Sequence, residues 1–304
     1  MLVRPKRSFP GTALLWTGSA LSHVWPHLTL IFVWSVLISL NDAWFREQLT
    51  LTMTPFSIMG VAISIFLGFR NNACYDRWWE ARKLWGRLIN TSRVFCRQTL
   101  TLIRADAAAH RALVYRMIAF VHALRLHLRE QLGDLSALKP WLDEEELEAL
   151  QRSSNVPNAI LSQTGRVLSI HSHGNRIAGM QLLLLENTLT ELANIQGGCE
   201  RIKNTPVPLA YTILTHRIVG VYCLTLPLGL VDTVGHLAPL VSLLVSFAFL
   251  GLDSVGSQIE DPFEEDPNDL PLSAISRMIE VNLREQLGEH GLPPMSQPEK
   301  GILS

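Results

Sequence analysis

The sequence predicts an all-α integral membrane protein with four transmembrane helices per subunit and a helical cytoplasmic domain. Hydrophobic residues make up 48% of the 304 residues and charged residues 17%, below the roughly 25% charged content of soluble domains. Four apolar stretches approach the about 20 residues that a membrane-spanning helix needs. The long polar stretch between the second and third of them shows helical periodicity and no strand-like alternation.

The first predicted domain, residues 1–69, holds an N-terminal segment and two membrane spans, Leu21–Leu40 and Leu49–Phe69. Basic residues lie within the first seven positions. Another apolar stretch follows them in place of a cleavage site and soluble sequence, so a signal peptide is not expected. We therefore predict a cytoplasmic N-terminus and a short outer loop, residues 41–48, between the two spans.

Charge changes abruptly where the second span ends. No charged residue lies between Leu49 and Phe69, whereas the stretch from Arg70 to Arg97 carries seven basic residues and only two acidic ones. Basic residues collect on the cytoplasmic side of membranes, so the chain is expected to enter the cytoplasm after Phe69. Pro55 is best accommodated in the first turn of this helix, where its missing N–H is not needed.

The second predicted domain, residues 70–204, is a cytoplasmic bundle of amphipathic helices. Its last helix begins near Ile177, and we expect Gly197 and Gly198 to interrupt it. Pro206 then marks the return of the chain to the membrane.

The third predicted domain, residues 205–254, holds the third and fourth spans, Leu209–Val231 and Leu237–Leu252, joined by a hairpin turn. The fourth, residues 255–304, is an acidic cytoplasmic segment followed by an amphipathic helix and a disordered tail. Four spans place both termini in the cytoplasm of a multi-pass protein of the plasma (inner) membrane.

The apolar residues of the second span form a candidate functional face. Val61, Ile65 and Phe69 recur at every fourth position and share one side of a helix. Two interpretations are open: the stripe packs inside a helix bundle, or it lines a pore.

Arg217 is a charge inside the third span. Such a charge costs about 3 kcal/mol to insert, so it should face protein or water. We favour a structural ion pair with an acid near Asp253 over a charge that faces a cavity.

Other classes of function find little support. A net charge of −1 gives no reason to expect a nucleic-acid partner. His171 and His173 are two positions apart and do not share a helix face, and no hydrolase, metalloprotease or nucleotide-binding motif is present. The four cysteines form no C-x-x-C pair and are expected to be free thiols.

Three stretches together resemble the bestrophin family of ion channels. They are GFRNN followed by RWWEARKLWG, then CERIKNTPVPLAYTILTHR from Cys199, and DPFEEDPNDLP from Asp261. Their order and spacing fit the family over nearly the whole chain, and the short C-terminal segment is similar to that of the prokaryotic branch.

The resemblance implies a homopentamer around a central pore. Val61, Ile65 and Phe69 match the hydrophobic neck of the family, where many animal members carry an aromatic residue at the position of Ile65. Met180 matches a second, cytoplasmic constriction; its alternative is ordinary packing of Met180 with the leucines that follow it. A narrow apolar ring gates by dewetting, because an ion must shed water to pass it.

The resemblance also marks a candidate cation site. Asp266 and Asp269 match carboxylate ligands of a calcium clasp in animal bestrophins, Asp261 replaces an asparagine, and Gln258 matches a residue that contributes its backbone oxygen. Two residues, Pro267 and Asn268, interrupt the run of acids. The departures favour a solvated acidic turn, and we expect no cofactor.

The sequence thus predicts a passive ion channel whose partners are its own copies, the lipid bilayer and permeating ions. The neck lacks basic residues and the cytoplasmic exit is acidic, which favours monovalent cations such as sodium over chloride. An anion channel of the same fold is the alternative. Two further alternatives are a membrane-anchored helical scaffold without conductance and a membrane enzyme that holds a metal with His171, His173 and the acids.

Overall fold

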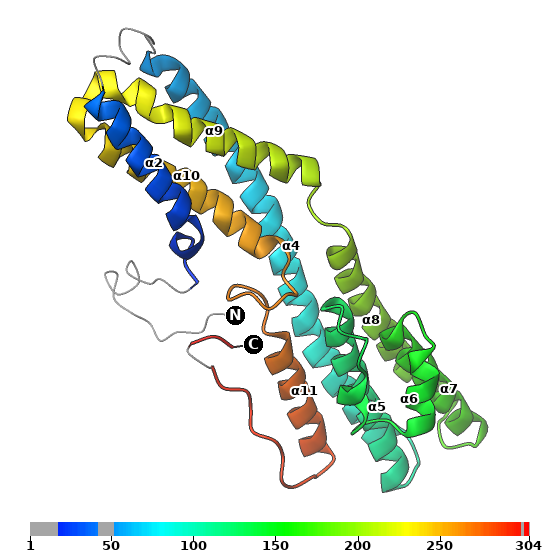
Figure 1. The fold of residues 1–304 in the computed structure, drawn as a ribbon. Coiled ribbons are helices and arrows are strands. Elements are labelled where there is room, and N and C mark those ends of the chain that lie inside the picture. Colours follow the sequence, from blue (N-terminus) through cyan, green and yellow to red (C-terminus); the bar gives the residue numbers. More distant parts are fainter. Residues whose placement is uncertain (1–17, 42–51, 299–300, 304) are drawn as a thin grey trace. The chain divides into compact units, whose positions relative to one another are not determined.

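The computed structural model describes residues 18–41, 52–298 and 301–303. The expected basic N-terminal segment and the loop of residues 42–48 lie outside the described residues. All the elements that the structure describes are helices, which confirms the all-α class (Figure 1). The chain divides into two compact units, with boundaries at Trp78/Trp79, Thr205/Pro206 and Asp261/Pro262.

The first unit, called the apolar unit here, comprises the described residues among 18–78 and 206–261. It contains α2 (Leu21–Leu40), the first part of α4 (Met53–Leu102), α9 (Leu209–Val234), the single 3₁₀ turn η2 (Gly235–Leu237) and α10 (Ala238–Glu260). Helices α2, α9 and α10 pack against one another pairwise (Figure 1).

Three helical stretches of the described chain are long and apolar enough to cross a membrane: Leu21–Leu40, Met53–Leu102 and Leu209–Glu260. The third of these contains both α9 and α10. Pro55 lies in the first turn of α4, as expected, because a helix has no use for that N–H. Helix α10 continues to Glu260, beyond the predicted end of the fourth span at Leu252.

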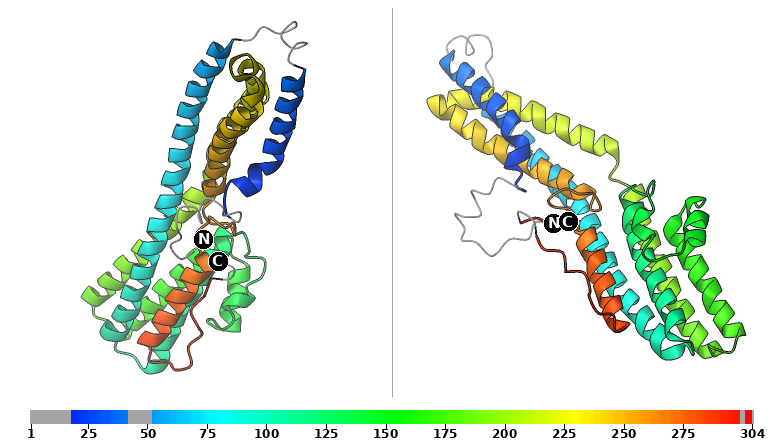
Figure 2. Two further views of the ribbon diagram at one scale, coloured as in Figure 1. Left: turned by 90° about the vertical axis from the view of Figure 1, so that its left-hand side faces the viewer. Right: turned by 60° about the horizontal axis from the view of Figure 1, so that its bottom comes forward.

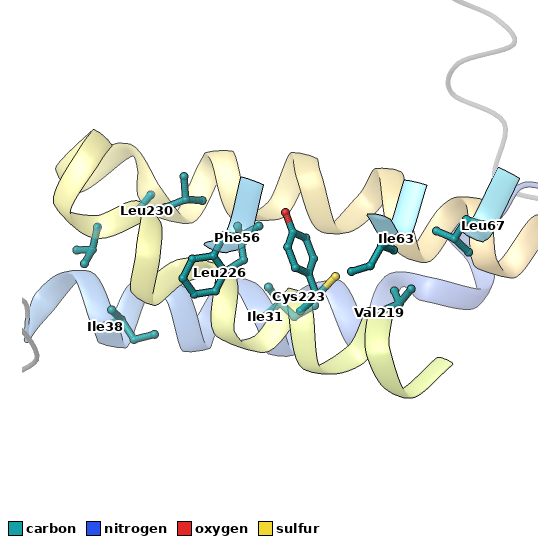
Figure 3. Close-up of a cluster of buried hydrophobic side chains, with 12 residues drawn as sticks. Ile31, Ile38, Phe56, Ile63, Leu67, Val219, Cys223, Leu226 and Leu230 are labelled. Carbon is teal, nitrogen blue, oxygen red and sulfur yellow. The ribbon is translucent and has the colours of Figure 1, made fainter. Parts of the chain in front are cut away.

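The core of the apolar unit joins one face of each of its helices (Figure 3). Ile31 and Ile38 of α2 belong to one cluster with residues of the inward face of α4 and of α9. The α4 residues of this core are Phe56, Ile63 and Leu67, and those of α9 include Val219, Cys223, Leu226 and Leu230. Large apolar side chains on the other faces stay exposed, among them Leu30, Val33 and Leu37 of α2. Helices that are apolar all round are typical of membrane spans.

The second unit, called the polar unit here, comprises the described residues among 79–205 and 262–303. It contains the remainder of α4, then α5 (Ala107–Leu128), η1 (Ser136–Leu138), α6 (Glu144–Gln151), α7 (Val156–His173), α8 (Gly179–Asn204) and α11 (Leu272–Gln286). Helix α5 packs against α7, α8 and α11, and α7 packs against α6 and α8 (Figure 2).

Local sequence explains where these helices begin. The side chains of Asp106, Asp143 and Asn155 each accept a hydrogen bond from the backbone N–H three residues on, at the start of α5, α6 and α7. The sequence predicts a helix from about Pro157 to His171, and α7 (Val156–His173) agrees with it within two residues at each end. The four cysteines are free thiols, as expected, and the structure shows that all four are buried.

The expected interruption of α8 at Gly197 and Gly198 is wrong. The helix runs without a break from Gly179 to Asn204. A Cβ on Gly198 would lie 3.0 Å from Cδ1 of Leu84, so this glycine lets α8 approach α4 closely. Gly198 therefore serves packing, whereas nothing lies within 4 Å of a Cβ on Gly197, and neither glycine ends the helix.

Candidate functional site

The outward face of α4 in the apolar unit is the main candidate. Val61, Ile65 and Phe69 are 63%, 53% and 64% exposed, whereas Ile63 and Leu67 on the inward face lie in the core. One chain therefore leaves a continuous apolar stripe uncovered. A stripe of this kind marks contact with lipid, with another subunit or with a pore.

A buried ion-pair cluster begins at Arg70, the residue that follows Phe69 in α4. The guanidinium of Arg70 is fully buried, and its Nη1 donates to Oδ1 of Asp253 at 2.6 Å. Its Nη2 donates to Oγ of Ser257 at 2.8 Å and to Oε2 of Glu260 at 3.3 Å. The three acceptors follow at helical spacing along one face of α10. Arg70 therefore fastens α4 to α10, and its charge is neutralised inside the unit.

His216 of α9 completes this cluster. Its Nε2 lies 3.2 Å from Oδ2 of Asp253, and the imidazole is 48% exposed. Arg217, the next residue, is exposed, and its side chain forms no ion pair within the described part of the chain. The pair that we expected Arg217 to make with an acid near Asp253 is thus made by Arg70 and His216. A cavity-facing role for Arg217 stays a prediction.

The residues of the candidate cation site fall in different units. Gln258 and Asp261 belong to the apolar unit, and Asp266 and Asp269 belong to the polar unit. The Asp266 N–H donates to Oδ2 of Asp269 at 2.7 Å, and the Asp269 N–H donates to the Asp266 carbonyl at 3.0 Å. No group of three or more metal-ligating His, Cys, Asp or Glu side chains occurs among the residues described.

Asp269 is the one deeply buried carboxyl of the acidic turn. It is 2% exposed, and its Oδ1 is buried without a hydrogen-bond partner. Burial raises the pKa of Asp269 to about 7; the hydrogen bond from Asp266 opposes this, and the nearby charges of Asp266 and Glu264 reinforce it. Because a metal ligand must be deprotonated, the raised pKa makes Asp269 a poorer calcium ligand than an ordinary aspartate.

Three other acids of the segment, Asp261, Glu264 and Glu265, have cationic partners from the protein. Arg129 Nη1 lies 3.0 Å from Oε1 of Glu265, and Lys203 Nζ lies 2.5 Å from Oε1 of Glu264. In the apolar unit, Arg77 Nη2 lies 3.9 Å from Oδ1 of Asp261. The segment is therefore much less negative in its surroundings than its sequence indicates.

Met180 lies in the first turn of α8 and is 76% exposed. Leu183 and Leu184 on the same side are also exposed, whereas Leu185 is fully buried. Core packing of Met180 is thus not observed within one chain, and its role in a constriction stays a prediction. On the buried side, Thr188 donates to Oε1 of Gln98 at 2.8 Å, so it bonds between helices.

The two histidines considered for a metal enzyme do not form a site. His171 is buried, and burial, reinforced by the charge of Arg176, lowers its pKa. His173 is exposed, and its Nδ1 lies 2.8 Å from the Ser169 carbonyl one turn earlier. The two rings therefore meet different surroundings.

These features define a helical membrane protein with uncovered apolar faces. A family model described as "Bacterial/Fungal Bestrophin protein" matches residues 1–285. The chain belongs to the bestrophin family. Bestrophins and the relatives named below are channels, and the chain is not an enzyme.

Similar proteins cover almost the whole chain. "Voltage-dependent anion channel-forming protein YneE" of Salmonella typhi is 39% identical over 99% of this chain and 98% of its own length. "Voltage-dependent anion channel-forming protein RSc3414" of Ralstonia nicotianae is 41% identical, over 96% of each. A crystal structure of a bacterial bestrophin homologue from Klebsiella pneumoniae superposes with a TM-score of 0.84 at 38% identity, covering 86% of this chain and 98% of that one.

The sequence did not single out the Arg70 cluster. A signal was present, because Asp253, Ser257 and Glu260 recur at helical spacing just past an apolar stretch. Those positions predict a polar stripe on one face of α10, and a basic residue at the end of a neighbouring span is its natural partner.

Proposed function

We propose that the chain is one subunit of a passive ion channel in the plasma (inner) membrane. The exposed stripe of Val61, Ile65 and Phe69 in a chain of this family carries the proposal. One chain has too few spanning helices to enclose a pore with a single helical face. A closed ring of identical subunits meets this need, since cyclic symmetry lets each copy present the same helix to the axis.

The subunit then crosses the membrane four times, through α2, α4, α9 and α10, and both termini lie in the cytoplasm. Five copies, as the family resemblance implies, form the ring. The seven basic residues from Arg70 to Arg97, just after the apolar part of α4, support a cytoplasmic location for that end of the span.

Conduction is diffusive, with no covalent chemistry. Ions pass a neck of three stacked apolar rings, one ring for each residue of the stripe, and then a second constriction at Met180. Narrow apolar rings oppose conduction because an ion loses hydration without gaining polar contacts. Met180 is 76% exposed, so its side chain is available to form the second constriction. At the neck, Arg70 is paired with Asp253 inside the unit, so its charge does not join the apolar stripe.

Anions are the favoured permeant ions. The names of the relatives point to anions, and cationic side chains of the protein offset the acidic segment that would otherwise favour cations. Monovalent cations such as sodium are the second candidate, because the stripe contains no basic residue and Arg70 is neutralised by Asp253 and Glu260.

Reversal potentials decide between the two. Purified protein in planar bilayers is measured in matched gradients of sodium chloride, sodium gluconate and N-methylglucamine chloride. An anion channel follows the chloride gradient in both chloride salts. A potential that follows sodium alone would establish the cation candidate, and an absence of current under all conditions would favour a non-conducting scaffold.

Calcium control is tested in the same recordings. We expect no calcium dependence, because Asp269 is buried and Asp261, Glu264 and Glu265 lie beside cationic side chains. Equal currents in calcium and in a chelator are expected. A calcium-dependent current that is lost in Asp266→Asn would instead support a calcium site at the acidic segment.

A further inference from the structure

The polar unit contains a pocket of about 340 Å³ whose lining includes none of Val61, Ile65, Phe69 and Met180. It lies between α5 and α11, with the segment after η1 and Ser296 of the C-terminal segment completing its wall. Its polar lining residues are His122 and Arg125 of α5, together with Ser273, Arg277 and Glu280 of α11. Trp141 and Pro140 supply an apolar side.

Arg125 is the unusual member of this lining. Its Nη1 donates to Oγ of Ser273 at 3.1 Å, and its Nε is buried without a hydrogen-bond partner. Within the described chain, Arg125 forms no ion pair. Burial lowers the pKa of Arg125, and the neighbouring charges of Arg129 and Arg277 lower it further, against the opposing charge of Glu265. A charge held in such surroundings needs a counter-charge.

The acids nearby are already engaged. Glu280 accepts from Arg277 Nη1 at 2.7 Å and lies 3.2 Å from His122 Nε2. A second arginine, Arg284, lies 3.6 Å from the same carboxylate. Glu265 pairs with Arg129, whose Nη1 also donates to Oγ of Ser273 at 2.9 Å. The pocket therefore carries an excess of positive charge.

The donors suit an oxyanion with several oxygens. Ser273 Oγ accepts N–H bonds from both Arg125 and Arg129, so its own O–H is available to a ligand. The guanidinium groups of Arg125 and Arg277 approach from the two helices. The Trp141 ring, stacked parallel to His122 with centroids 6.0 Å apart, offers a flat wall for an uncharged part of the ligand.

We propose that this pocket binds a small phosphate-bearing molecule through Arg125, Ser273 and Arg277. Phosphate presents more oxygens than a carboxylate and so can engage all three donors at once, and guanidinium groups bind it by paired hydrogen bonds. The volume exceeds that of inorganic phosphate and accommodates a phosphate monoester with a small organic group. Binding supplies the counter-charge that Arg125 lacks and joins α5 to α11.

Calorimetry on the full-length protein in lipid nanodiscs tests the proposal, with inorganic phosphate as the titrant at constant ionic strength. Saturable binding at one site per chain is expected. Arg125→Gln should weaken it at least tenfold, because charge-assisted hydrogen bonds are among the strongest polar contacts. Arg277→Gln should weaken phosphate binding several-fold, and this variant replaces Arg125→Gln as the test if Arg125→Gln does not fold.

Arg166→Gln is the matched control. Arg166 is an exposed arginine of α7 in the same unit, so this variant makes the same charge change away from the pocket. It should bind phosphate like the wild type. Equal affinity in all variants, or a response that does not saturate, would overturn the proposal. Tighter binding of acetate than of phosphate would overturn the ligand class. The result is independent of conductance, because binding is measured directly.

Discussion

The apolar and polar units treat buried positive charge in opposite ways. In the apolar unit, Arg70 is fully buried and two carboxylates compensate it. In the polar unit, Arg125 is partly buried and forms no ion pair within the described chain. The first arrangement satisfies the charge internally and fixes two helices. The second leaves a charge that a ligand can satisfy, so the contrast separates a structural arginine from a binding one.

The same contrast holds for apolar residues. In the first part of α4, Val61, Ile65 and Phe69 face outward. In its later part, within the polar unit, Trp85 and Phe95 are fully buried. The two parts of α4 therefore differ. In the polar unit these large apolar side chains are buried away from water, whereas in the apolar unit the stripe is exposed toward lipid, a partner subunit or a pore.

Removing Arg70 should give the largest effect. Arg70→Met leaves Asp253 buried without its main partner, and breaking a buried pair costs about 3–5 kcal/mol. Chemical unfolding of the purified protein in detergent measures this. Lys83→Met, at an exposed lysine of the same helix, is the control and should change little. A small loss for Arg70→Met would mean that the cluster does not fasten α4 to α10.

Asp269→Asn should stabilise the protein at neutral and higher pH. The folded protein holds the proton of Asp269 up to a pKa of about 7, whereas the unfolded chain loses it near 3.8. Stability from this group therefore falls as pH rises through that window and is constant above it. At about 1.4 kcal/mol per pKa unit, the amide should add about 2–4 kcal/mol at pH 8.

Unfolding of Asp269→Asn is compared with the wild type at pH 8 and pH 4, in the presence of a chelator. The gain should disappear at pH 4, where the wild-type carboxyl is protonated as well. A variant less stable than wild type at pH 8 would show that the charged carboxylate has a partner.

The packing around one glycine in each unit can be compared. A Cβ on Gly229 of the apolar unit would lie 2.5 Å from the Phe56 ring, whereas one on Gly198 of the polar unit would meet the mobile end of Leu84 at 3.0 Å. Gly229→Ala should therefore cost about 1–3 kcal/mol by overpacking. Gly198→Ala should cost less, because the added carbon would overlap Leu84 less than the carbon at position 229 would overlap Phe56. If both variants lose the same unfolding free energy, packing around the two glycines is equally tight and the proposed difference is wrong.

Arg125→Met should give the smallest change in stability. An uncompensated buried charge contributes little to folding, and an apolar side chain of similar length fits a partly apolar pocket. In phosphate-free buffer the free energy of unfolding should stay within about 1 kcal/mol of wild type. A loss as large as that of Arg70→Met would make Arg125 a structural residue.

The sequence allowed the prediction of most of the helices. The predicted helix from about Pro157 to His171 agrees with α7 within two residues at each end, and α2 has the predicted bounds of the first span, Leu21–Leu40. These features depend on neighbours in the chain. Glycine misled us in α8, because the sequence cannot distinguish a glycine that breaks a helix from one that admits a neighbouring side chain.

Charge partners were harder to predict. Arg70 and Asp253 are far apart in the sequence, so periodicity alone gives no reason to join them. The sequence instead suggested Arg217 as the partner of an acid near Asp253, because Arg217 lies deeper in an apolar stretch. Arg125 and Ser273 meet because α5 packs on α11, a tertiary contact that no local pattern contains. The stripe of Val61, Ile65 and Phe69 was evident in the sequence, and its exposure required the structure.

The most direct test of the account is single-channel recording of wild type, Ile65→Ala and Phe69→Ala in planar bilayers under asymmetric sodium chloride. If the stripe lines the narrowest part of a pore, both truncations should increase the current, since a wider and less apolar neck is easier to wet. Val33→Ala, at an exposed apolar residue of α2, is the matched control and should conduct like the wild type. Currents that neither truncation changes would contradict the account and return the stripe to packing against lipid or a neighbouring subunit.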